Sequence, residues 1–232
     1  MRVLVISDVH GNAPALEAVL AEPHDVLVCL GDVVGYGPEP GTCLRRVGDT
    51  AELLLRGNHD HALATGAPPG CRANFRWLAD STAALGLAQV SATARAALGA
   101  FPTHACQVLA GVNCFFVHVT PRDPLYRYLS ADPAAWADEV EQLAADIVFV
   151  GHTHLQFQLA VAGRTLVNPG SVGQPKDGDP RAAYALLEDG TIRLRRVAYP
   201  VECTVAALER SGVDPQAAAT LSALLRTRRA PG

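Results

Sequence analysis

The sequence predicts an α/β fold, with a parallel sheet formed early in the chain and antiparallel hairpins formed later. The first third alternates short apolar runs, rich in β-branched residues, with helical stretches, and this rhythm favours parallel strand pairing. In the second half, three dipeptides that suit tight turns separate strand-like runs. These dipeptides are Ala110-Gly111, Ala162-Gly163 and Asp189-Gly190.

The elements of the first third follow from local signals. The apolar run at residues 2–6 predicts a buried strand. Asn12 is a typical helix N-cap and Pro14 suits the first turn, while Leu16 and Val19 share one helical face. The expected elements that follow are a strand at 25–30, a loop at 35–38 rich in glycine and proline, a short helix near 42–47 and a strand at 51–55.

Residues 66–104 differ in character from the first third. Pro68-Pro69-Gly70 interrupts regular secondary structure, and the alanine-rich stretch from Asn74 to Ala100 predicts broken helices. This segment is too short to bury a core of its own, so we interpret it as an insertion near the functional site of a single domain that spans 1–232. Two further helices are expected near 132–144 and 215–227.

Composition and charge restrict the classes of function that the sequence allows. The 232 residues are 49% apolar and 18% charged with a net charge of −4, as expected of a soluble enzyme. The net negative charge argues against nucleic acid and membrane surfaces as partners. No apolar segment is long enough to span a bilayer. Six cysteines without a CxxC pair, and no leader-like N-terminus, predict a reduced cytoplasmic protein whose oligomeric state is open, a homodimer included. The basic group Arg226, Arg228 and Arg229 is interpreted as a solvated helix end.

Five apolar runs end directly in polar residues that can bind metal ions. In an α/β sheet, ligands collect at the carboxyl ends of the strands, so these side chains are expected to converge. Carboxylate oxygen, imidazole nitrogen and amide oxygen suit borderline divalent metals, and the lack of cysteine argues against a structural zinc site. Seven candidates exceed what one ion with open positions can hold, which indicates two ions that share a carboxylate. The candidate ligands are Asp8, His10, Asp32, Asn58, His118, His152 and His154.

The order of these motifs resembles that of the calcineurin-like metallophosphoesterases. The family pattern of DxH, GD, GNHD/E, an isolated His and GHxH is matched between Asp8 and His154. The stretches 7–12, 35–38 and 168–175 also resemble a small prokaryotic branch labelled phosphodiesterase-like or diadenosine-tetraphosphatase-like. The resemblance extends from the first residue to about residue 200. It implies a four-layer αββα sandwich, in which two mixed β-sheets pack face to face and are flanked by helices.

The resemblance also implies roles for individual residues. His59 would act near the leaving group as general acid or charge stabiliser. The implied activity is hydrolysis of small phosphate esters, of phosphodiester or nucleotide type, by attack of a hydroxide that bridges two ions. Manganese is the first expectation for both ions, with iron, zinc, nickel, cobalt and magnesium also open. One ion would be held by Asp8, His10, Asp32 and His154, and the other by Asp32, Asn58, His118 and His152, with Asp32 bridging.

Other interpretations stay open from the sequence alone. A scaffold of this fold could bind partners without turnover, or the same pocket could serve as a nucleotide sensor. A phosphoprotein phosphatase is a further alternative, but the Asp and Arg that animal-type protein phosphatases carry after the GD motif are absent from residues 33–37. Many close relatives have glycine where this chain has Val119, whose bulk is expected to change substrate access. The substrate could equally be a diester, a monoester or a dinucleoside polyphosphate.

The remaining residues are interpreted from their context. Asp60 is expected either to orient His59 or to cap a helix. Residues 168–175 are expected to form a rigid turn at the floor of the site, with Gly170 or Gly173 at positive φ. Arg122 and Arg181 are candidate phosphate contacts, whereas His24, His61 and His104 are interpreted as structural or solvated.

Overall fold

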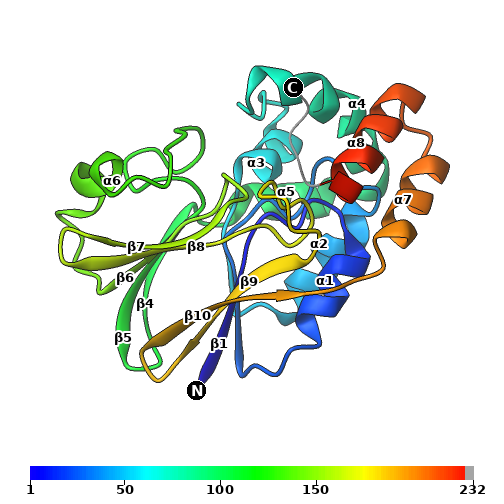
Figure 1. Ribbon diagram of the computed structural model, residues 1–232. Coiled ribbons are helices and arrows are strands. Elements are labelled where there is room, and N and C mark those ends of the chain that lie inside the picture. Colours follow the sequence, from blue (N-terminus) through cyan, green and yellow to red (C-terminus); the bar gives the residue numbers. More distant parts are fainter. Residues whose placement is uncertain (228–232) are drawn as a thin grey trace.

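Two five-stranded sheets form the centre of the computed structural model, which describes residues 1–227 (Figure 1). In each sheet, neighbouring parallel strands are extended by antiparallel ones, so both sheets are mixed. The sheets pack face to face, and helices cover their outer faces. This arrangement confirms the four-layer sandwich that the family resemblance implies.

The first sheet contains strands from both ends of the described chain. In order across the sheet these are β10 (Thr191–Val197), β9 (Ala182–Glu188), β1 (Arg2–Ile6), β2 (Val26–Cys29) and β3 (Leu53–Leu54). β1, β2 and β3 run parallel, and β9 lies antiparallel to β1 with Leu187 opposite Val3. The turn between β9 and β10 has φ of 50° at Asp189 and 72° at Gly190, the left-handed values that a two-residue hairpin requires.

The second sheet is built from the middle of the chain. In order across the sheet its strands are β4 (His104–Leu109), β5 (Val112–Val117), β6 (Ile147–Phe149), β8 (Arg164–Pro169) and β7 (Gln156–Val161). β5, β6 and β8 run parallel, whereas β4 and β7 are antiparallel edge strands. The predicted turns at Ala110-Gly111 and Ala162-Gly163 join the two hairpins of this sheet, and all four residues have positive φ.

Eight helices lie within the described residues. They are α1 (Ala13–Leu20), α2 (Pro40–Thr50), α3 (Asn58–Thr65), α4 (Ala73–Gln89), α5 (Ala92–Ala100), α6 (Pro133–Val140), α7 (Val201–Arg210) and α8 (Pro215–Thr227). The first of them begins where local chemistry predicts, because the side chain of Asn12 accepts a hydrogen bond from Ala15 N at 3.2 Å. α4 and α5 occupy the alanine-rich stretch in which broken helices are expected.

Successive side chains of a strand point to opposite faces of the sheet, and this explains how each sheet packs against a layer on either side. In β1, Val3 and Val5 point into the core between the sheets, where they meet Phe116 and Phe149 of the second sheet. The intervening Leu4 points to the opposite face, in a cluster with residues of α1 and α2. A strand buried on both faces needs apolar side chains at every position, and this accounts for the continuous apolar run of β1.

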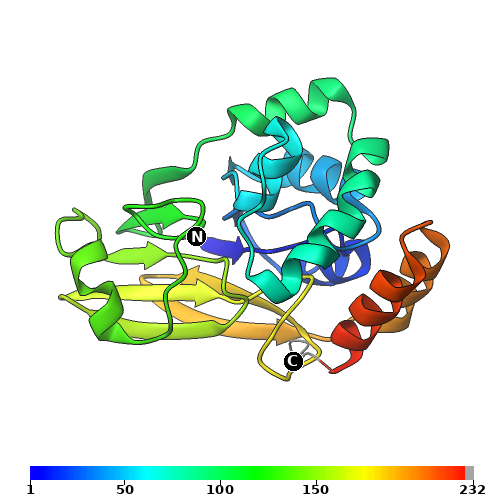
Figure 2. The ribbon, with the colours of Figure 1, turned by 90° about the horizontal axis from the view of Figure 1, so that it is seen from above.

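Helices cover the two outer faces unequally. α6 covers the outer face of the second sheet, where its buried Trp136 packs with Phe115 and Val148. At the other end of the molecule α7 and α8 pack side by side (Figure 2). They join α4 in a cluster that includes Phe75 and Leu221. This cluster supports the wall of the candidate site, because Phe75 also lines its cavity.

Two helices are absent from the sequence-based expectations. The first turn of α3 consists of buried polar residues, so it has no apolar periodicity that would predict a helix. α7 follows Pro200 directly. Its buried positions Thr204, Val205 and Leu208 have the spacing of one helical face, a signal that the sequence-based expectations did not use. Arg228 and Arg229 lie outside the described residues, and Arg226 pairs with Glu202. The cysteines are free, and no described helix is long and apolar enough to cross a membrane.

Candidate metal centre

Every predicted ligand lies just beyond the carboxyl end of a strand. The strands belong to two sheets rather than to one, so the candidate site sits where the same ends of both sheets meet. The first sheet contributes four ligands and the second contributes three. Asp8 and His10 follow β1, Asp32 follows β2, Asn58 begins α3 after β3, His118 follows β5, and His152 and His154 follow β6.

Five of these seven residues have a left-handed backbone. A left-handed conformation costs a non-glycine residue about 1–2 kcal/mol, and such strain concentrates at functional sites. The turns after the strands aim these side chains back toward one point, which a continued strand would not do. The φ angles are 57° at Asp8, 47° at His10, 54° at Asp32, 65° at His152 and 62° at His154.

A first group of ligand atoms surrounds the carboxylate of Asp8. Asp8 Oδ1 lies 3.6 Å from His10 Nε2 and 3.4 Å from His154 Nε2. The other oxygen, Oδ2, accepts a hydrogen bond from the backbone N–H of His152 at 3.0 Å. Asp8, His10 and His154 thus form a buried cluster whose ligand atoms lie close enough to share one cation.

A second group surrounds the amide oxygen of Asn58. Oδ1 of Asn58 lies 3.0 Å from His118 Nε2 and 3.0 Å from His152 Nδ1. Asp32 Oδ2 lies 3.2 Å from His118 Nε2 and 3.9 Å from His10 Nε2, so it faces both groups. Asp32 Oδ1 accepts the backbone N–H of His59 at 2.8 Å, which fixes the carboxylate in this orientation.

Hydrogen bonds outside each group determine which atoms face inward. Nδ1 of His10 donates to the carbonyl of Val34 at 3.0 Å, and Nδ1 of His118 donates to that of Leu30 at 3.1 Å. His154 does the same with the carbonyl of Gln174. A carbonyl oxygen can only accept, so in the neutral rings the proton sits on Nδ1 and Nε2 presents a lone pair.

Several inward-facing atoms are acceptors that have no donor, and this arrangement fits cations. The lone pairs of His10 Nε2 and His154 Nε2 face each other at 3.1 Å, an unfavourable contact unless a positive charge lies between them. Asp8 Oδ1 is buried and has no hydrogen-bond partner. Asn58 Nδ2 donates to the carbonyl of Pro69 at 2.6 Å, which turns the amide oxygen toward the other acceptors. A buried acceptor without a donor is costly, and a divalent cation would satisfy it.

Electrostatics keep the two carboxylates ionised. Burial raises the pKa of Asp32, but the neighbouring imidazoles, His118 first among them, outweigh burial and hold that pKa well below its usual range. The pKa of Asp8 is lowered in the same way, with burial opposed chiefly by His154. Against the effect of burial, the carboxylate of Asp32 in turn raises the pKa of the His118 imidazole to about 9, so this ring holds a positive charge in the metal-free site. A divalent cation would replace that proton and leave two ionised carboxylates among imidazole ligands, a donor set that suits borderline divalent metals.

The chain matches a known protein family. Residues 1–190 match the calcineurin-like phosphoesterase superfamily domain. The chain belongs to this superfamily. The family is metal-dependent, and the two clusters of ligand atoms described above are its candidate metal-binding residues in this chain.

Individual proteins resemble this chain in sequence or in fold. A crystal structure of a metallophosphoesterase from Sphaerobacter thermophilus is 32% identical, with a TM-score of 0.82, and the match covers 98% of this chain and 99% of that one. The protein MJ0912 of Methanocaldococcus jannaschii is 30% identical over 223 residues, which cover 86% of this chain and 88% of the relative. The crystal structure of PH1004 from Pyrococcus horikoshii OT3 shares the fold at 18% identity, with a TM-score of 0.79 and coverage of 95% and 97%.

Glycines allow the ligand-bearing turns to pack against one another. A Cβ on Gly37 would lie 2.0 Å from the carbonyl oxygen of His10, and one on Gly173 would lie 1.9 Å from that of Val9. Gly173 is therefore needed for close approach and not for positive φ, whereas Gly170 has φ of 80°. The 168–175 segment lies against the first ligand turn, as expected, because Ser171 Oγ donates to the carbonyl of Asp8 at 2.7 Å.

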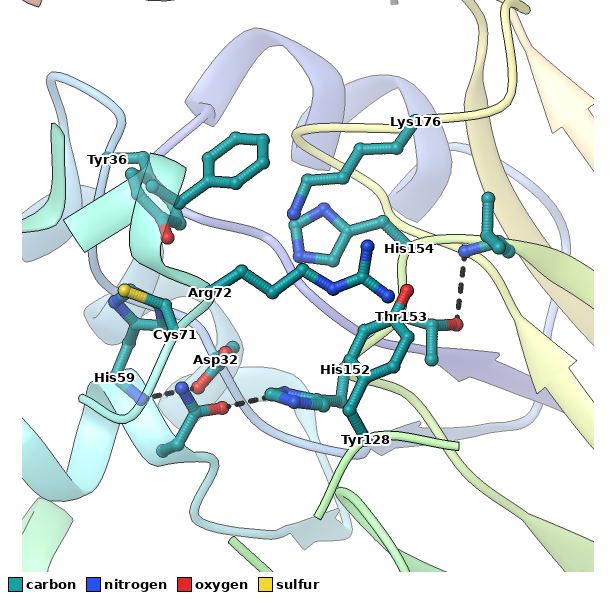
Figure 3. Close-up of a pocket in the computed structure, with 13 residues that line it drawn as sticks. Asp32, Tyr36, His59, Cys71, Arg72, Tyr128, His152, Thr153, His154 and Lys176 are labelled. Atoms are coloured by element: carbon teal, nitrogen blue, oxygen red, sulfur yellow. Dashed lines mark hydrogen bonds between the residues drawn. The ribbon is translucent and has the colours of Figure 1, made fainter. Parts of the chain in front are cut away.

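A cavity of about 220 Å³ opens over the ligands (Figure 3). Its wall combines metal-ligand candidates with aromatic and cationic side chains that the sequence motifs do not include. His59 lines this cavity and also a second, more apolar one behind it, of about 350 Å³, between α3 and α4. The lining residues of the first cavity outside the five ligand motifs are Tyr36, which belongs to the 35–38 loop, and Cys71, Arg72, Phe75, Tyr128, Leu155 and Lys176.

The cations of the cavity differ from those expected. Arg181 is exposed and pairs with Asp179 at 2.7 Å, so its charge is neutralised away from the ligands. Arg122 is not among the residues that line the cavity, and its backbone N–H donates to Glu139. Arg72 and Lys176 line the cavity instead. They come from irregular segments without periodicity or motif, so sequence reasoning had no signal for them.

The other expectations have mixed outcomes. Of the two roles expected of Asp60, helix capping is confirmed: it lies in the first turn of α3, and its carboxylate accepts the backbone N–H of the N-cap Gly57 at 3.1 Å. Val119 is buried and is not among the residues that line the cavity over the ligands. None of the three remaining histidines belongs to either cluster within residues 1–227: His24 contacts the Glu22 carbonyl, His61 the Tyr126 ring and His104 the Phe115 ring.

Proposed function

We propose that this phosphoesterase hydrolyses phosphate esters, of diester or nucleotide type, with two divalent cations, manganese first among the candidates. The observation that carries the proposal is the convergence of seven candidate ligand atoms in two groups, with Asp32 Oδ2 facing both. No donor of the described residues satisfies the buried Oδ1 of Asp8. Such an arrangement is stable only around positive charge, and two neighbouring metal ions are the family's means of activating water against a phosphorus centre.

The two groups suggest how the cations would be shared. The ligands of one would be Asp8, His10, Asp32 and His154, and those of the other Asp32, Asn58, His118 and His152. Cations held in this way would lower the pKa of water toward neutrality and neutralise charge on the phosphoryl oxygens. The neutral amide of Asn58 would hold one of them without adding negative charge that repels the substrate.

His59 is positioned to act on the leaving group. Its ring lies edge-on to that of His10, with centroids 5.1 Å apart, and its backbone N–H is bound to Asp32 Oδ1. The imidazole therefore borders the ligands but belongs to neither cluster. From this place it would act on the oxygen that departs from phosphorus. Burial lowers the pKa of His59 to about 3, so the neutral ring favours charge stabilisation by a hydrogen bond over transfer of a proton held in advance.

Metal-dependent turnover is the direct test of the proposal. Metal-free protein should not hydrolyse p-nitrophenyl phosphate or bis-p-nitrophenyl phosphate, and addition of manganese, nickel, cobalt or magnesium should restore turnover in step with two bound equivalents. Initial rates and metal content would be measured on the same samples. Two bound equivalents without hydrolysis of either ester, or of a panel of nucleotides, would contradict the proposal and favour a binding scaffold or nucleotide sensor.

Replacing His59 separates its role from metal binding. In His59→Ala the backbone N–H that binds Asp32 remains, so metal content should stay at the wild-type level while kcat falls by about 10²–10³-fold. The effect should be smaller for a substrate with a good leaving group, such as p-nitrophenolate, than for an alkyl ester. Equal losses on both esters, or a loss of bound metal that accounts for the lower rate, would reject a role at the leaving group.

A further inference from the structure

Two cations of the cavity lie on aromatic rings. The guanidinium carbon of Arg72 lies 3.7 Å from the ring centroid of Tyr128, and Lys176 Nζ lies 4.2 Å from that of Phe75. Figure 3 shows Arg72 extended across the cavity toward Tyr128, and Lys176 reaching over His154. An aromatic face positions a cation without neutralising it, and a guanidinium stacked on a ring keeps its in-plane N–H donors free.

These two cations lack the carboxylate partners that other basic residues have. Among the ion pairs of residues 1–227, none includes Arg72 or Lys176, whereas Arg76 pairs with Asp80 and Arg181 with Asp179. Neither Arg72 nor Lys176 donates a hydrogen bond to a carboxylate of the described residues. Their charges and donors therefore stay available to an anion that enters the cavity, where charge-assisted hydrogen bonds are strong.

The position of Arg72 is itself unfavourable for the helix that it begins. Arg72 is the N-cap of α4 and makes no side-chain capping bond, although N-caps are normally Ser, Thr, Asp or Asn. A cation at this end also opposes the helix dipole. A capping residue would stabilise α4 better, so a basic residue here is explained most simply by an anion in the cavity beside it.

The charge balance of the cavity indicates how many negative charges that anion carries. Two divalent cations, the carboxylates of Asp8 and Asp32 and the attacking hydroxide would together carry a net charge of one positive unit, which the single negative charge of a phosphodiester already balances. The positive charges of Arg72 and Lys176 then remain. A second phosphate group on the substrate would balance them, whereas a phosphodiester with a single negative charge would leave the cavity strongly positive.

We propose that Arg72 and Lys176 bind a second, non-reacting phosphate group, so that the preferred substrates are esters with two or more linked phosphates. This inference rests on the proposed function, which places the reacting phosphate at the seven ligands. The aromatic rings of Tyr128 and Phe75 hold the two cations in place before the substrate arrives, which lowers the entropic cost of binding.

Binding of phosphonates that cannot be hydrolysed tests this inference. Methylenediphosphonate and methylphosphonate would be titrated by calorimetry into wild type, Arg72→Ser and Lys176→Met, each both metal-free and manganese-loaded. We expect each variant to lose about tenfold to a hundredfold in affinity for the diphosphonate, as for loss of a charge-assisted hydrogen bond, and less than about threefold for the monophosphonate. Arg76→Ser, which removes a paired arginine of the same helix, should leave both affinities unchanged.

Fold and metal content serve as internal checks on the variants. Because serine is a better N-cap than arginine, Arg72→Ser should melt at the wild-type temperature or above it while binding the diphosphonate more weakly. A purely structural role of Arg72 would produce the opposite, with a lower melting temperature and no preference for one phosphonate. Unchanged diphosphonate affinity in both variants would overturn the inference.

The two proposals fail separately because this binding needs no turnover. Hydrolysis of p-nitrophenyl phosphate, combined with equal losses of affinity for both phosphonates, would reject the second phosphate site and leave the proposed function intact. A selective loss for the diphosphonate in a protein that hydrolyses no ester would reject the proposed function and leave the anion site standing.

Discussion

Asp32→Ala is expected to lower turnover of p-nitrophenyl phosphate and bis-p-nitrophenyl phosphate by about 10³-fold or more, because shared cations contribute several kcal/mol to transition-state stabilisation. The Oδ2 of Asp32 is the one carboxylate oxygen that faces both groups of ligands, 3.2 Å from His118 Nε2 and 3.9 Å from His10 Nε2. Its removal withdraws a negative charge from both groups at once. Manganese content, measured by mass spectrometry after gel filtration, should fall from two equivalents to one or none.

A matched control distinguishes this loss from a general effect of removing an aspartate. Asp49 lies on the exposed face of α2, and Asp49→Ala should retain wild-type rate and metal content. Asp32→Asn is a finer variant, because an amide oxygen can still ligate while the charge is lost. We expect it to retain part of the bound metal. An Asp32→Ala protein with two bound equivalents and undiminished rates would refute the bridging role.

Strand positions were largely predictable because each strand carries its own signal. β1 is confirmed residue for residue, and the three hairpin turns have the positive φ values that their Gly-containing dipeptides predict. The runs that end at Asp32 and His118 are equally clear in sequence. Which strands share a sheet is not local information, and a single open sheet would have brought the ligands together just as well.

The convergence of the seven candidate ligands was predictable for a related reason. Parallel strands end at one edge, so residues that follow them meet there whatever the details of their packing. What the motifs did not indicate is the left-handed backbone that turns Asp8, His10 and Asp32 inward, or the hydrogen bonds that fix each ring. These depend on contacts between segments that are more than twenty residues apart, such as His10 with Val34.

The walls of the cavity could not be predicted from the sequence. Arg72 and Tyr128 belong to segments without apolar periodicity, and they meet only because α4 and the loop before α6 fold over the same sheet ends. The prediction that Arg181 contacts phosphate is wrong, because the charge of a residue alone cannot reveal that Asp179, two residues away, neutralises it. Predicting a free cation requires knowledge of every carboxylate within reach, which is tertiary information.

Asp60→Ala should produce the largest loss of stability, about 3–5 kcal/mol in the free energy of unfolding of the metal-free protein. The buried carboxylate of Asp60 accepts four backbone hydrogen bonds: from Asp32 N at 2.7 Å, Val33 N at 3.0 Å, Val34 N at 3.1 Å and Gly57 N at 3.1 Å. Alanine would leave these donors buried and unpaired. The turn that holds Asp32 in its left-handed conformation would lose its anchor to α3, so metal content should fall as well.

Urea denaturation in the presence of a chelator measures this loss without the contribution of metal binding to stability. Asp60→Asn should have an intermediate effect, because its amide keeps one acceptor oxygen but turns an NH₂ group toward backbone N–H donors. Asp80→Ala is the surface control: Asp80 forms an exposed pair with Arg76 four residues away on α4, and its loss should cost no more than about 0.5 kcal/mol. A change below about 1 kcal/mol in Asp60→Ala would mean that water replaces the carboxylate, because four buried donors without any acceptor would cost more than that.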